Sequence, residues 1–63
     1  MTIKRFMETM ENETTAITFI INCLGTQESY TKEEADKLVW EWGKEEVKSY
    51  FMLNTREMMI NIK

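Results

Sequence analysis

The residues that could do chemistry in this chain are few, and they lack a base to activate them. Cys23 is the single cysteine, and the sequence contains no histidine. A thiol becomes a nucleophile when a neighbouring base or cation lowers its pKa, whereas Cys23 lies in an apolar segment. One thiolate also cannot complete a structural zinc site, which needs four nitrogen or sulfur ligands. We therefore interpret Cys23 as a small buried hydrophobic residue.

Carboxylates occur as adjacent pairs, at positions 33–34 and 45–46. Neighbouring residues on a helix point in different directions, so neither pair can act as one acid–base unit or as a chelate. The sequence has no glycine-rich phosphate loop and no calcium-loop spacing. It therefore predicts no catalytic residue, no metal site and no cofactor, and we expect a protein that is not an enzyme.

Length and charge restrict the remaining functions. The chain has 63 residues, which predicts one compact domain over 1–63 that buries only about 60% of its unfolded surface. Residues 28–46 hold three basic and seven acidic side chains, a net −4 within a total of −3. This balance disfavours direct nucleic-acid binding, which relies on clustered Lys and Arg. One cysteine and no apolar run of membrane-spanning length predict a cytoplasmic protein with no membrane partner.

The clearest predicted element is a helix over residues 31–44. Thr31 and Glu34 match the capping box that starts a helix, and Gly43 offers a left-handed residue at its end. An apolar stripe of helical period runs through Ala35, Leu38, Val39 and Trp42. Trp40 lies about 150° from this stripe and is therefore expected outside the core. In the alternative, Trp40 packs on the N-terminal segment.

A C-terminal hairpin of strands 47–53 and 58–62 is predicted from alternating apolar residues. We pair Leu53 with Met58. In this register Phe51 faces Ile60 on a strongly apolar side of the ribbon. The opposite, mixed side then carries Tyr50, Met52 and Met59.

The segment 2–24 has two interpretations. Its β-branched residues favour a strand at about 15–23, after residues 2–11 that are helical or extended. This gives an α+β fold, a small antiparallel sheet of about three strands packed on helix 31–44. Apolar residues at alternating spacings of four and three instead favour a helix, which gives an all-α N-terminal half.

The predicted surface, rather than a motif, carries the functional prediction. Trp and Tyr are enriched in binding hot spots, and Met adapts its shape to a partner. The predicted partner-binding residues are Trp40, Glu33, Asp36, Glu41, Tyr50, Met52 and Met59. Together they predict an acidic protein that docks on a larger protein with a basic surface.

In length and charge the chain resembles accessory proteins of phages and mobile elements, which often inhibit host nucleic-acid enzymes such as restriction or CRISPR nucleases. This resemblance implies an inhibitor whose carboxylates stand in for phosphates in a basic groove. Two alternatives stay open. The same patch could form a symmetric homodimer. The chain could also be a small DNA-binding transcriptional regulator that uses helix 31–44 in a helix-turn-helix, although the acidic residues of this helix disfavour it.

Overall fold

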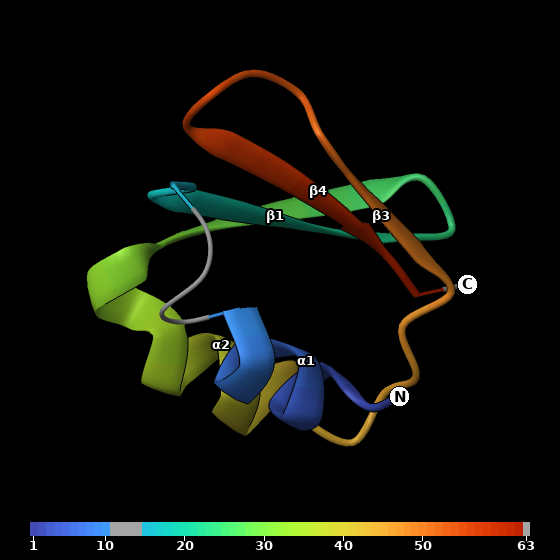
Figure 1. Ribbon diagram of the computed structural model, residues 1–63. Coiled ribbons are helices and arrows are strands. Elements are labelled where there is room, and N and C mark those ends of the chain that lie inside the picture. The colour runs from blue at the N-terminus through green and yellow to red at the C-terminus, as the bar shows by residue number, and fades with distance from the viewer. Residues whose placement is uncertain (11–14, 63) are drawn as a thin grey trace.

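The computed structural model describes residues 1–10 and 15–62, which form two α-helices on one face of a four-stranded sheet (Figure 1). The elements are α1 (Ile3–Met10), β1 (Thr18–Cys23), β2 (Thr26–Thr31), the 3-10 turn η1 (Lys32–Glu34), α2 (Ala35–Trp42), β3 (Ser49–Met52) and β4 (Glu57–Asn61). This order confirms the α+β class. The all-α alternative for the N-terminal half is wrong, because β1 and β2 separate α1 from α2. The same separation means that α1 and α2 do not form a helix-turn-helix. Residue 11 of the predicted N-terminal element lies outside the described residues.

The sheet is mixed, whereas the sequence predicted an antiparallel one. Its strand order is β2-β1-β4-β3. Two antiparallel hairpins, β1–β2 and β3–β4, are joined by parallel pairing of the central strands β1 and β4. The prediction lacked β2, an edge strand of polar sequence in which only Tyr30 is buried. Such a strand shows little of the apolar alternation that predicts strands.

The turn between β1 and β2 consists of Leu24 and Gly25, with φ values of 51° and 88°. Positive φ at both central residues is typical of the type I′ turn, whose twist matches that of a hairpin. Gly25 adopts this conformation without strain, whereas the left-handed conformation costs Leu24 about 1–2 kcal/mol. The turn therefore sets the register of β1 and β2 at a small local cost.

The C-terminal hairpin is shorter than predicted, and its register differs by one residue. Met58 pairs with Met52 and not with Leu53. The cause lies in the connection, where the Asn54 side-chain oxygen accepts a hydrogen bond from the backbone N–H of Glu57 at 3.0 Å. This contact closes the loop one residue earlier, and the Leu53 N–H donates to the Glu57 carbonyl at 2.8 Å.

A shift of one residue exchanges the two faces of a strand. Tyr50 stands opposite Ile60 on the helix-covered face, where its ring centroid lies 4.8 Å from that of Phe6. Phe51 stands opposite Met59 on the other face, which neither of the described helices covers (Figure 1) and which we call the open face. The predicted distribution of β3 side chains is therefore wrong.

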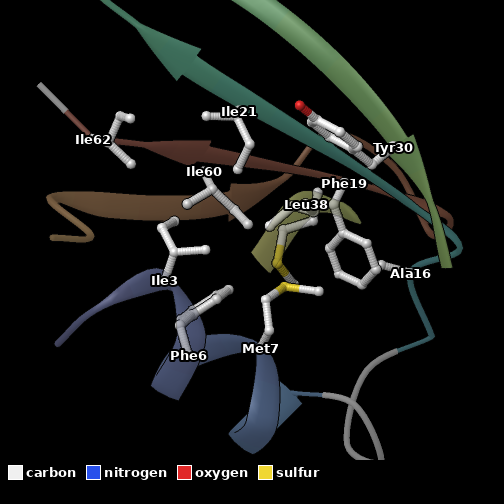
Figure 2. Packing of buried hydrophobic residues seen from close by; sticks show 11 residues of the cluster. Ile3, Phe6, Met7, Ala16, Phe19, Ile21, Tyr30, Leu38, Ile60 and Ile62 are labelled. Carbon is white, nitrogen blue, oxygen red and sulfur yellow. The ribbon is translucent and has the colours of Figure 1, made fainter. Parts of the chain in front are cut away.

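The core lies between the helices and the sheet, and Figure 2 shows side chains from both layers meeting there. Its buried members are Ile3, Phe6, Met7, Ala16, Phe19, Ile21, Tyr30, Leu38, Met58, Ile60 and Ile62. Leu38 is fully buried, and Ala35, Val39 and Trp42 pack against the cluster. The apolar stripe predicted for this helix is confirmed.

The start of the predicted helix is confirmed, but its end differs. The capping box at Thr31 and Glu34 is present, followed by η1 and then α2. Gly43 has φ −55°, so the predicted left-handed conformation is wrong. The absence of a side chain matters there for space, since a Cβ on Gly43 would lie 2.3 Å from the Val39 carbonyl oxygen.

The start of α1 is bound to the end of α2 through the backbone. The first N–H groups of a helix have no partner within the helix. Here the Ile3 N–H donates to the Glu45 carbonyl at 2.8 Å, and the Lys4 N–H donates to the Gly43 carbonyl at 3.2 Å. These bonds hold the two helices together as one layer.

Candidate functional site

Trp40 is the most exposed large apolar side chain among the described residues, at 86% exposure. Leu38, two residues earlier, is fully buried against the core. Residues two apart on a helix do not share a face, so Trp40 lies on the outer side of α2. An indole this exposed does not pack on the N-terminal segment, so the prediction that it lies outside the core is confirmed. Asp36 and Lys37, four and three residues earlier, share its face of the helix and are exposed.

The turn before α2 adds negative charge to this surface. Glu33 in η1 is exposed. The Glu34 carboxylate accepts hydrogen bonds from the backbone N–H of Thr31 at 3.0 Å and from its hydroxyl at 3.2 Å. Both bonds lower the pKa of Glu34, and the bond from the backbone N–H has the larger effect. We call the exposed set Glu33, Asp36, Lys37 and Trp40 the α2 surface.

Glu41 also has an internal role, which the sequence did not indicate. Its carboxylate accepts a hydrogen bond from the Tyr30 hydroxyl at 2.5 Å. The Glu28 carboxylate lies 2.9 Å from the same hydroxyl, which in turn accepts the indole N–H of Trp42 at 2.9 Å. A tyrosine has one hydroxyl proton, so the two carboxylates compete for it. Burial and the hydrogen bond to Glu41 raise the pKa of Tyr30.

The other predicted binding residues lie away from the α2 surface. Tyr50 and Met52 belong to the edge strand β3, whereas α2 packs on α1 and on β2, the opposite edge of the sheet. Met59 lies on the open face but is only 8% exposed. The predicted residues therefore do not form one patch, because α2 and β3 lie at opposite edges of the sheet and Met59 is buried.

Sequence reasoning placed Tyr50 and Met52 on an exposed side of the hairpin but assigned Phe51 and Leu53 to the side that faces the core. Phe51 and Leu53 are about half exposed, as are Tyr50 and Met52 between and beside them. The signal was present in the sequence as an uncharged run, Tyr-Phe-Met-Leu at 50–53. We call Ser49–Met52 together with Leu53 the β3 edge.

A row of polar side chains crosses the open face beside the β3 edge. The Asn22 amide donates to the Asn61 side-chain oxygen at 2.8 Å, and the Asn61 amide donates to the Ser49 hydroxyl at 3.0 Å. Within the described residues, the Asn22 side-chain oxygen is buried without a hydrogen-bond partner. The row links β1, β4 and β3, so it supports the packing of the two hairpins on each other.

A cavity of about 270 Å³ lies between α1 and α2. Its lining residues are Lys4, Met7, Glu8, Phe19, Lys32, Ala35, Asp36 and Val39. Pockets for small-molecule ligands usually measure about 300–1,000 Å³. The volume of this cavity is below that range. Its lining includes two basic and two acidic side chains, so its charge favours neither an anionic nor a cationic ligand.

Residues 1–10 and 15–62 offer no further chemical or membrane-spanning site. Cys23 is a free thiol that packs against the core. These residues include no group of three or more Cys, Asp or Glu side chains placed to hold a metal ion. They also include no helix of the length and hydropathy needed to cross a membrane. No known protein-family profile, curated protein or solved structure matches the chain.

Proposed function

We propose that this chain is a non-enzymatic binding protein that docks on a larger protein through the α2 surface. The observation that carries the proposal is the 86% exposure of Trp40. A tryptophan buries about 150–250 Å² when it is covered, which at about 25 cal/mol per Å² corresponds to roughly 4–6 kcal/mol before the costs of association. No other large apolar side chain among the described residues offers as much uncovered area.

The charge of the α2 region supports a basic partner surface. Glu33, Asp36 and Lys37 are exposed on the α2 surface, and residues 28–46 as a whole carry a net −4. Complementary charge accelerates docking and selects among partners. We therefore propose a partner with a basic groove, of the kind that handles nucleic acid, which this protein would occupy and inhibit. In this proposal it acts in the cytoplasm as a phage or mobile-element accessory protein.

The test is affinity capture of bacterial proteins on the immobilised chain, compared among three forms. Wild type and Leu24→Ala should retain the same basic protein, and Trp40→Ala should lose it. Leu24 is a matched control, because it is a large apolar residue at 78% exposure in the β1–β2 turn. For the purified partner, Trp40→Ala should weaken binding by at least about 30-fold, the effect of a hot-spot residue worth 2 kcal/mol.

Two results would contradict the proposal. A folded Trp40→Ala variant with full affinity would remove the indole from the interface. Affinity that stays constant between about 50 and about 500 mM salt would remove the role of charge, since exposed charges are screened over that range.

A further inference from the structure

The β3 edge carries neither of two features that often keep an edge strand from pairing with another chain, namely charged side chains and proline. A third such feature, short length, is present, since β3 has four residues. No charged residue and no proline occurs between Ser49 and Leu53. The other edge, β2, differs, since it carries Glu28 and otherwise mainly polar residues. The β3 edge therefore presents an open backbone between half-exposed apolar side chains.

We propose that the β3 edge pairs antiparallel with the β3 edge of a second copy, joining the two four-stranded sheets into one across a two-fold axis. This interface is separate from the α2 surface and does not depend on the proposed function. We choose a second copy as the partner because two antiparallel β3 strands complement each other. The outward backbone donors of one strand meet the acceptors of the other, and their apolar side chains meet as well.

The backbone of β3 determines the register. The Leu53 N–H donates to the Glu57 carbonyl, toward β4. The backbone N–H and C=O groups of successive residues point to alternate sides of an antiparallel strand. Those of Tyr50 and Met52 therefore point away from β4, toward the free edge of the sheet. If Tyr50 of each copy pairs with Met52 of the other, every outward N–H and C=O of these residues gains a partner. The same register places the two Phe51 residues opposite each other at the two-fold axis.

The side chains agree with this register. Phe51 of both copies lies on the open face, so the two open faces are continuous and the helices of both copies lie on the other side. Ile20, Met59 and Phe51 are cross-strand neighbours on that face. Pairing would extend this row across the axis from Phe51 to its counterpart. The nearest charged residue, Lys48, would face Asn54, so no like charges oppose each other.

The area available predicts a weak dimer. The side chains of four residues are about half exposed: Tyr50, Phe51, Met52 and Leu53. If each would bury about 150–250 Å² when fully covered, the surface still available for burial is roughly 300–400 Å² per copy. The total of roughly 600–800 Å² lies below the 1,200–2,000 Å² of stable interfaces. We therefore expect a dissociation constant on the order of 10 to several hundred μM.

Sedimentation velocity of the wild-type protein from about 2 to about 800 μM tests the proposal over that range. A concentration-dependent shift from monomer to dimer supports it, and a monomer at every concentration overturns it. Phe51→Lys places two ammonium groups together at the axis and should weaken the dimer at least about tenfold. Ser29→Lys, an exposed residue on the opposite edge strand β2, should leave the dimer unchanged.

Disulfide crosslinking tests the register in a Cys23→Ala background. Residues opposite each other at a non-hydrogen-bonded position have Cα atoms about 4.5 Å apart, close enough for a disulfide. Phe51→Cys should therefore crosslink readily on oxidation. The two Ser49 positions would lie about 13 Å apart, four residues along the strand, so Ser49→Cys should crosslink slowly. Equal rates, or a faster reaction of Ser49→Cys, would overturn the register.

Discussion

Removing the Tyr30 hydroxyl is the sharpest test of how β2 holds α2. The substitution Tyr30→Phe keeps the buried ring, which is 5% exposed, and deletes only the oxygen. The Tyr30 O–H donates to the Glu41 carboxylate at 2.5 Å or to the Glu28 carboxylate at 2.9 Å, and its oxygen accepts the Trp42 indole N–H at 2.9 Å. The three hydrogen-bond partners come from β2 and α2, so their loss should loosen the contact between these elements.

The expected loss follows from the groups left without partners. A hydrogen bond to a charged group contributes about 1.5–3 kcal/mol, and the lower end applies because Glu28 and Glu41 are exposed to water. The Trp42 N–H loses its acceptor in a partly buried site, at about 1 kcal/mol. Together these give about 2–3 kcal/mol, out of a total stability of roughly 3–9 kcal/mol for a chain of this length.

Urea denaturation followed by tryptophan fluorescence measures this loss, at about 2 μM to keep the chain monomeric. Tyr50→Phe is the matched control, because the Tyr50 hydroxyl makes no hydrogen bond within the described part of the chain and should change the free energy of unfolding by less than about 0.5 kcal/mol. If Tyr30→Phe also changes it by less than 0.5 kcal/mol, the hydroxyl does not hold α2 on β2.

The same pair of proteins predicts a pH dependence. The pKa of Tyr30 is raised in the folded state, so its contribution is complete below the pKa of an unfolded tyrosine, about 10. It is lost as the pH rises above 10 toward the folded pKa. The advantage of the wild type over Tyr30→Phe should therefore be constant from about pH 7 to pH 9 and shrink above pH 10. An advantage that does not change above pH 10 would contradict this assignment.

Two further predictions concern the ends of the α2 region. A Gly→Ala substitution at a residue of helical φ normally stabilises a protein. At Gly43 the added Cβ would lie 2.3 Å from the Val39 carbonyl oxygen, so urea denaturation of Gly43→Ala should show a free energy of unfolding about 1–3 kcal/mol lower than that of wild type. An increase would show that the backbone moves to make room for the methyl group. The pKa of Glu34 is lowered by the Thr31 N–H, so its contribution is present above the unfolded pKa of about 4.3 and lost as the pH falls through the folded pKa. Thermal unfolding should therefore find Glu34→Gln less stable than wild type at pH 7, with the difference narrowing below pH 4, and an unchanged difference would exclude the capping contact.

Local signals predicted the start and the inner face of α2. The capping box and the helical period depend on residues within a few positions of one another, and both are present in the structure. The sequence does not distinguish a helical from an extended α1, because a helix of eight residues is marginal without its packing partners. Its hydrogen bonds to Gly43 and Glu45 depend on residues about forty positions away, which no local pattern reveals.

The candidate site was predicted only in part, for the same reason. The exposure of Trp40 follows from the helical period. The positions of Tyr50, Met52 and Met59 depended on one hairpin register, and the Asn54 side chain set a different one. The hydrogen bonds of one loop side chain, Asn54, with Arg56 and Glu57 thus accompany the register that decides which of the hairpin's aromatic and methionine residues face the helices.

The parallel pairing of β1 with β4 has a consequence for how the chain reaches this fold. Each hairpin is local and can form within about 1–10 μs. Their pairing joins residues such as Asn22 and Asn61, which are 39 positions apart, and long-range contacts of this kind slow folding. Until the hairpins meet, β1 and β4 are edges as open as β3 is in the native protein. The period of greatest risk of aggregation is therefore before the two halves dock, when each hairpin has two free edges.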